Sequence, residues 1–122
     1  MIDVWKVGNA TRDPELRYTP NGVGVAEFNI AENLKDKNGN ESTEFHRCVA
    51  FNKLAENVTE TVKKGTRVIV VGRASNKPWE DKEGNKRTSY KILASFVGPD
   101  LNWATASIVK NSKSDKGTNA DF

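Results

Sequence analysis

The sequence predicts an all-β domain with one helix, because it combines a period-two strand pattern, one helical stripe and turn dipeptides. Residues 43–51, Thr-Glu-Phe-His-Arg-Cys-Val-Ala-Phe, alternate in the way of a strand whose successive side chains point to opposite faces. Leu54, Val58 and Val62 recur at every fourth residue, which gives one narrow apolar stripe on a helix. The 122 residues suffice for one hydrophobic core, so we expect a single domain.

The order of the expected elements indicates a barrel. Five strands are expected, at residues 4–7, 23–31, 45–51, 68–71 and 90–97. The helix falls between the third and fourth strands, with Asn52 as its N-cap and Gly65 as its C-cap. Charged segments flank Gly84-Asn85, which predicts a long exposed hairpin. This order is typical of the OB-fold, a five-stranded Greek-key barrel that binds oligonucleotides on its second and third strands.

Two local patterns add detail to this barrel. The apolar parity changes at Gly24, which predicts a bulge or a sharp coil where the second strand turns a corner. Alternation in Leu101–Val109 predicts an extra C-terminal strand, which would lie across a neighbouring subunit. We place the OB-fold domain at residues 1–110. Residues 111–122 are expected to form a short disordered tail, because they carry almost no apolar side chains to bury.

The third strand carries the first candidate binding face. One face carries Phe45, Arg47, Val49 and Phe51, whereas the other carries His46, Cys48 and Ala50. An arginine between two aromatic rings is seldom buried without a partner. Rings and a cation on a partly solvated sheet face suit the stacking of unpaired bases beside phosphates. The alternative, that the two rings cap the core from a sheet edge, stays open at this point.

Composition narrows the function classes. The formal net charge of +3 and the pI of about 9.0 favour a polyanionic partner. The single cysteine excludes an internal disulfide and fits a reducing cytoplasm. We expect no signal peptide at the N-terminus and no membrane span, because no segment is apolar for long enough.

Three segments resemble the bacterial single-stranded DNA-binding proteins. They are residues 7–22, which include Asp-Pro-Glu-Leu-Arg-Tyr, residues 43–56 and residues 64–72, and the likeness covers about residues 1–100. The resemblance implies an OB-fold, a homotetramer and sequence-independent binding of single-stranded DNA without catalysis or cofactor. It also implies roles in DNA replication, recombination and repair, in the cytoplasm with the nucleoid.

By this resemblance, the base-stacking residues fall on Phe45, Phe51 and Trp79. Matching basic positions fall on Arg47, Lys53 and Lys77. We add two arginines of the fourth strand and the hairpin as candidate DNA contacts, Arg73 and Arg87. Trp79 follows Lys77-Pro78 in a charged segment with no apolar neighbours, which favours ligand stacking over local packing.

The sequence also departs from the family pattern. Where many members carry a tryptophan in the loop after the second strand, this chain has Leu34 and Lys35. The family's strongly acidic tip, which recruits replication and repair proteins, has only Asp121-Phe122 as a counterpart, and nearby lysines offset its charge. Two interpretations stay open: an actinobacterial-like member, or a short-tailed accessory paralogue.

Two functions of other classes are weighed against DNA binding. One is a hydrolase that uses His46 and Cys48 as base and nucleophile, although no residue is placed by sequence to orient the histidine. A small core cysteine and a rim or interface histidine are favoured instead. A lone His with one Cys is also too few ligands for a structural zinc site, so no metal is expected. The other rival is an OB-fold protein-interaction module of a replication-restart complex with little DNA affinity.

Overall fold

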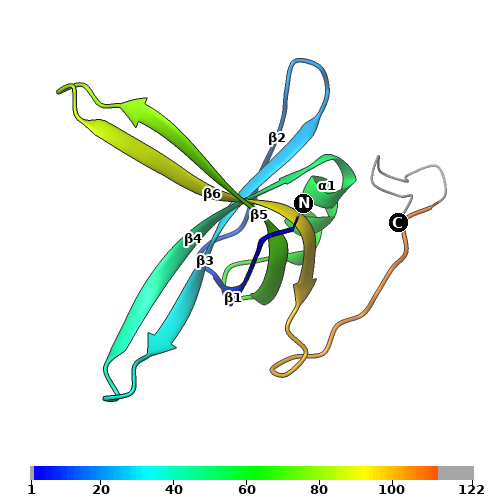
Figure 1. Cartoon of the computed structure of the whole chain (residues 1–122). Coiled ribbons are helices and arrows are strands. Elements are labelled where there is room, and N and C mark those ends of the chain that lie inside the picture. Colours follow the sequence, from blue (N-terminus) through cyan, green and yellow to red (C-terminus); the bar gives the residue numbers. More distant parts are fainter. Residues whose placement is uncertain (1, 113–122) are drawn as a thin grey trace.

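The computed structural model describes residues 2–112 (Figure 1). Six strands and one helix follow one another along the chain: β1 (Val4–Ala10), β2 (Glu15–Tyr18), β3 (Gly24–Lys35), β4 (Glu41–Phe51), α1 (Asn52–Thr61), β5 (Arg67–Glu80) and β6 (Lys86–Pro99). No helix within this part of the chain is long and apolar enough to cross a membrane.

Five of the strands close into a barrel. The sheet order is β1-β5-β6-β4-β3, and a further pairing of β1 with β3 closes the ring. All neighbours are antiparallel except β4 and β6, which run parallel and pair at only two positions, Cys48–Ile92 and Val49–Leu93. Strand β2 pairs with β3 outside the ring. Because α1 lies between the third and fourth barrel strands, β4 and β5, the predicted OB-fold is confirmed.

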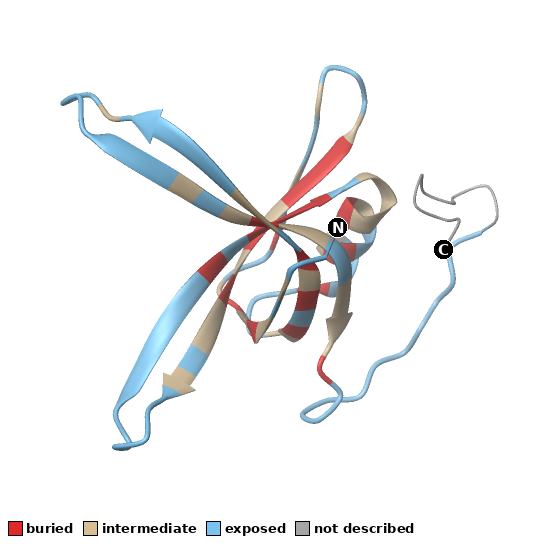
Figure 2. Cartoon of the chain, viewed as in Figure 1, coloured by how far each residue is buried: buried red, intermediate tan, exposed pale blue. Residues whose placement is uncertain are grey.

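The core is the inside of this barrel, plugged at one end by the helix (Figure 2). Strands β3, β5 and β6 supply apolar side chains that are almost fully buried, among them Phe28, Val70 and Ile92. Val58 of the helix and Val62, the residue that follows it, are buried as the four-residue spacing predicts. Most other helical residues remain solvated, so α1 covers the barrel with one stripe only.

The bulge that closes the barrel lies in a different strand from the one predicted. Strands β3 and β4 keep one register from Val25–Phe51 to Lys35–Glu41, so the bulge expected at Gly24 is wrong. The shift lies between β5 and β6: Val71 pairs with Phe96 and Gly72 with Ala94, so Ser95 of β6 is the extra residue. A Cβ atom at Gly72 would overlap the carbonyl oxygen of Leu93, which explains why this position needs a glycine.

The helix ends also differ from the prediction. Asn52 is the first helical residue, with φ of 60°, and no side chain caps the N-terminus. At the other end Val62 is the C-cap, so Gly65 lies beyond the helix. Gly65 makes a separate turn with φ of 89°, and its N–H donates to the carbonyl of Ala10. The helix is held by its packing rather than by the predicted caps.

Two long hairpins, β3–β4 and β5–β6, project from the barrel and diverge (Figure 1). Each tip is tied by an aspartate: Asp36 accepts the N–H groups of Asn38 and Asn40, and Asp81 accepts those of Glu83 and Asn85. These hydrogen bonds hold the pKa of both carboxyl groups below the usual value. The exposed hairpin around Gly84-Asn85 is therefore confirmed.

Two segments were misjudged from sequence. Strand β2 was not among the five expected strands, and its four residues lack a clear alternation. Conversely, Leu101–Val109 forms no strand in the described chain. Its apolar side chains are solvated, with Trp103 77% and Ile108 88% exposed. The predicted tail lies, from residue 113 onward, outside the described residues.

Candidate nucleic-acid interface

From Phe45 to Cys48, strand β4 alternates between exposed and buried side chains, as predicted, although Val49 on the face of Phe45 is buried. Phe45 is 69% and Phe51 39% exposed, and Arg47 between them is exposed as well. His46 and Cys48 point the other way and are buried. Phe45 therefore does not cap the core, whereas Phe51 is partly covered. The strand thus offers two rings and a guanidinium to solvent on one face.

A groove of about 650 Å³ opens where the two hairpins part. Because β4 and β6 pair only at Cys48–Ile92 and Val49–Leu93, their edges separate beyond these positions. Figure 1 shows the two arms diverging from this point. Side chains of β4, β5 and β6 line the groove: Arg47, Lys77, Pro78, Trp79, Thr88, Ser89 and Tyr90. We call it the inter-hairpin groove.

Two aromatic rings belong to this groove. Trp79 is 52% and Tyr90 44% exposed. Trp79 lies opposite Arg87 in the hairpin register, whereas Tyr90 lies opposite Asn76. The two rings therefore start from opposite faces of the hairpin, and the groove extends around the free edge of β6. Tyr90 was missed from sequence; its one signal was an aromatic within a charged hairpin.

The groove is basic. Arg47 and Lys77 line it, and no acidic side chain does so among the described residues. Arg73 lies on β5 opposite Leu93 and is exposed outside the groove. Arg87 lies across from Trp79, but its Nε is 3.2 Å from Oδ2 of Asp81. Of the predicted residues, the structure thus brings Arg47, Lys77 and Trp79 together.

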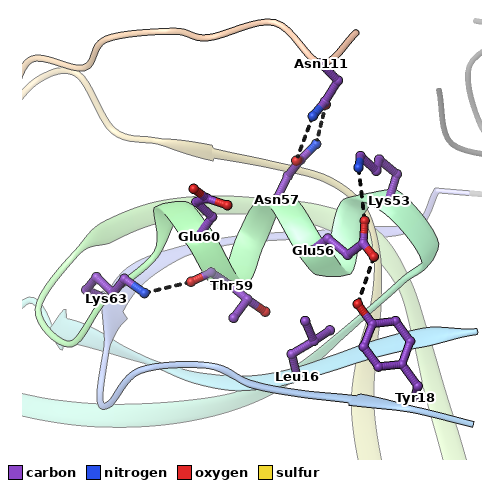
Figure 3. Close-up of a pocket in the computed structure, with 9 residues that line it drawn as sticks. All are labelled: Leu16, Tyr18, Lys53, Glu56, Asn57, Thr59, Glu60, Lys63 and Asn111. Atoms are coloured by element: carbon purple, nitrogen blue, oxygen red, sulfur yellow. Dashed lines mark hydrogen bonds and ion pairs between the residues drawn. The ribbon is translucent and has the colours of Figure 1, made fainter. Parts of the chain in front are cut away.

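Lys53 lies in a second groove, between β2 and α1, which Figure 3 shows. Its Nζ is 3.1 Å from Oε1 of Glu56, and the hydroxyl of Tyr18 donates to Oε2 of the same carboxylate at 2.8 Å. That hydrogen bond raises the pKa of Tyr18. Asn57 and Asn111 exchange amide hydrogen bonds above it. We call this the β2–α1 groove.

The geometry of His46 and Cys48 does not suit nucleophilic catalysis. The thiol of Cys48 is fully buried and donates weakly to the carbonyl of His46 at 3.8 Å. Burial raises its pKa to about 12, so the reactive thiolate is absent at neutral pH. The imidazole is directed at Glu32 instead, with Nε2 2.9 Å from Oε1. The cysteine is a core residue, as favoured from sequence.

An OB-fold barrel with a basic, aromatic-lined groove between its hairpins defines a class: the nucleic-acid-binding OB-fold proteins. Comparison with known proteins places the chain more closely. The model of the single-strand binding protein family matches residues 1–100, and the chain belongs to this family.

Named relatives come from actinobacteria, in line with the likeness stated above. The chain is 42% identical to the single-stranded DNA-binding protein of Mycolicibacterium smegmatis, over 88% of this chain and 69% of the relative. It is also 42% identical to that of Paenarthrobacter aurescens, over 89% and 67%. Single-stranded DNA-binding protein 2 of Streptomyces coelicolor matches at 42%, over 91% of this chain and 59% of the relative.

Proposed function

We propose that this protein binds single-stranded DNA without regard to sequence, and that the inter-hairpin groove and the wet face of β4 form the binding surface. The observation that carries the proposal is the groove itself: Trp79 and Tyr90 offer rings beside Arg47 and Lys77, and no described acidic side chain lines it. The family and the names of its relatives support this function over a protein-only module of a replication-restart complex.

The mechanism is physical rather than chemical. Every base has a π-face, so a ring stacks on any base, for about 1–3 kcal/mol each. Phe45, Phe51, Trp79 and Tyr90 are the proposed stacking residues. Duplex DNA hides its base faces between neighbouring pairs, so this surface prefers unpaired strands. No step breaks or forms a covalent bond.

The cations supply the second part of the binding energy. Arg47 and Lys77 meet phosphates beside the rings, with Arg73 and Arg87 nearby. Each neutralised phosphate releases counterions, so the affinity falls as the salt concentration rises. We assign the protein, on this basis, to the handling of exposed single strands in replication, recombination and repair, in the cytoplasm with the nucleoid.

We further propose that the chain assembles with copies of itself, as a homotetramer. The outer face of β1, β5 and β6 carries a row of apolar neighbours, in which Trp5 lies opposite Val71 and Val71 opposite Phe96. Trp5 is 69% and Phe96 53% exposed in the single chain. Contiguous apolar surface of this kind marks an interaction site. Several linked subunits would multiply weak stacking contacts along one strand.

Sedimentation of Trp5→Glu and Phe96→Glu tests the assembly, with Trp103→Glu as the matched control outside this face. We expect the first two variants to sediment as smaller species and the control to sediment like the wild type. An unchanged assembly in both variants would place the subunit contact elsewhere.

Fluorescence anisotropy with a labelled dT oligonucleotide tests the DNA proposal. We expect saturable binding of the labelled strand. An unlabelled dA oligonucleotide should displace it, whereas a duplex of equal length should not. Equal competition by the duplex, or no binding at low salt, would overturn the proposal.

A further inference from the structure

The base of the β3–β4 hairpin gathers three ligand-type side chains on the face away from the proposed DNA surface. Glu32 lies directly across from Glu44 in the register, and His46 follows two residues along β4. Nε2 of His46 is 2.9 Å from Oε1 of Glu32 and 3.9 Å from Oε2 of Glu44. One ligand atom from each residue lies within 4.8 Å of the other two.

This arrangement is unusual for a sheet. Like charges directly opposite each other on antiparallel strands are destabilising. Lys6 approaches Glu32, with its Nζ 3.8 Å from Oε1, and within the described chain it is the only lysine or arginine that pairs with Glu32 or Glu44. One lysine against two carboxylates leaves an excess negative charge beside an imidazole whose side chain is only 8% exposed. The cluster therefore has a net charge that attracts a cation.

The donor set and its geometry suit a metal. An imidazole nitrogen with carboxylate oxygens is a ligand set typical of zinc and similar transition ions. Ligand bonds of about 2.0–2.2 Å at a tetrahedral centre put ligand atoms roughly 3.3–3.5 Å apart. The observed 2.9 and 3.9 Å bracket this value, so small side-chain rotations suffice. Residues i and i+2 of one strand, with one directly across, share a single face.

We propose that Glu32, Glu44 and His46 bind one divalent transition ion of the zinc class, with water completing the coordination. Magnesium and calcium fit less well, because they prefer oxygen ligands alone. Lys6 does not coordinate; it stays beside Glu32 and moderates the affinity. This proposal stands apart from DNA binding, since Phe45 and Arg47 lie on the other face of β4.

Two consequences follow from the position and the chemistry. The ion would join β3 to β4 where the hairpin leaves the barrel, so it would stabilise the folded state by mass action. It would also compete with a proton for Nε2 of His46, so its affinity would fall in acid. The chain holds a single histidine, and its one cysteine is buried, which leaves few competing ligands.

The test is a titration of the full, untagged chain, stripped with a chelator, with Zn²⁺ by calorimetry and with Co²⁺ by visible absorption. We expect one ion per chain, tetrahedral Co²⁺ bands and a zinc-dependent rise in melting temperature. His46→Gln and Glu44→Gln should each weaken binding at least about tenfold. Glu41→Gln is the matched control, because this exposed glutamate lies on the same strand with the parity of Phe45.

Two different variants are used so that unfolding of one cannot by itself explain a loss of metal binding. Glu44 has a side chain that is 57% exposed, so its substitution leaves the core intact even if His46→Gln unfolds the chain. Binding that Glu44→Gln and His46→Gln leave unchanged would overturn the proposal. No stoichiometric binding would also overturn it, and would leave His46 in contact with Glu32 without a metal.

Discussion

The two grooves of this barrel hold the same number of lysine and arginine side chains but differ in everything that surrounds them. The inter-hairpin groove has Arg47 and Lys77 with no described acidic lining residue, and two rings lie beside them. The β2–α1 groove has Lys53 and Lys63, but Glu56 and Glu60 line it as well (Figure 3). The first groove therefore has a formal charge of +2 and the second has none.

This difference indicates that a matching sequence position alone does not make a lysine or arginine a phosphate contact, because neighbouring carboxylates compete for the cation. Lys53 follows Phe51 closely along the chain, yet its Nζ lies 3.1 Å from the Glu56 carboxylate. A cation already paired in this way gains little from a phosphate, because it must first give up its partner. Arg47 and Lys77 have no such carboxylate lining their groove among the described residues.

Removal of the tryptophan ring should give the largest effect. Trp79→Ala loses a large exposed stacking surface, so we expect single-strand affinity to fall by about 1–3 kcal/mol. Trp103→Ala is the matched control, since Trp103 is 77% exposed and lies outside the groove. Anisotropy titrations of both variants provide the measurement. Equal losses of affinity in the two variants would contradict the assignment of DNA binding to the inter-hairpin groove.

The face of β4 comes next. Phe45→Ala and Phe51→Ala should each cost about 1–3 kcal/mol of binding, with the smaller loss at the less exposed Phe51. The fold should survive, because neither ring belongs to the core. Cys48→Ala changes the buried face instead and should leave DNA affinity nearly unchanged. If Cys48→Ala weakens binding more than Phe51→Ala does, the assignment of the two faces is wrong.

The two tyrosines compare the grooves directly. Tyr90→Ala should weaken binding by about 1 kcal/mol, near the lower end for a stacked ring. Tyr90→Phe should bind like the wild type, because the ring rather than the hydroxyl carries the contact. Tyr18→Ala removes a somewhat more exposed ring, from the β2–α1 groove, and should not change DNA affinity. A loss at Tyr18 would show that DNA reaches the second groove.

The smallest effect concerns single charges. Lys77→Gln should lower the steepness of the salt dependence by about 0.7 in log–log slope, the value for one phosphate of a single strand. Lys53→Gln should leave the slope unchanged, because that lysine is already paired with Glu56. Affinities measured over a series of salt concentrations decide this. A larger change of slope for Lys53→Gln than for Lys77→Gln would indicate that the β2–α1 groove, and not the inter-hairpin groove, contacts phosphate.

Much of the barrel could be predicted from local patterns, since alternation and turn dipeptides report directly on strands. Strand β2 could not, because of its four residues only Leu16 packs against the core, which leaves no alternating pattern. The bulge at Gly72 depends on how closely Leu93 of another strand approaches, which no local pattern shows. The strand expected at Leu101–Val109 failed because alternation alone provides no partner strand.

The candidate site, like the barrel, could be predicted from the sequence only in part. The wet face of β4 follows from its sequence, because side chains alternate strictly along a strand. Lys53 was predicted as a DNA contact from the family resemblance; the structure places it on the first turn of α1, in the β2–α1 groove, which the resemblance did not indicate. Tyr90 lines the groove because β6 separates from β4 beyond two paired positions, and no local sequence pattern predicts this separation.

The most direct test of the inter-hairpin groove follows the fluorescence of Trp79 alone. In a Trp5→Phe/Trp103→Phe variant, Trp79 is the only tryptophan left of the three. Titration with unlabelled oligo-dT should quench its emission and saturate at the same concentration as binding followed by anisotropy, because the ring stacks on bases. Saturable binding with unchanged Trp79 emission would contradict the central claim, since the DNA would then bind elsewhere on the protein.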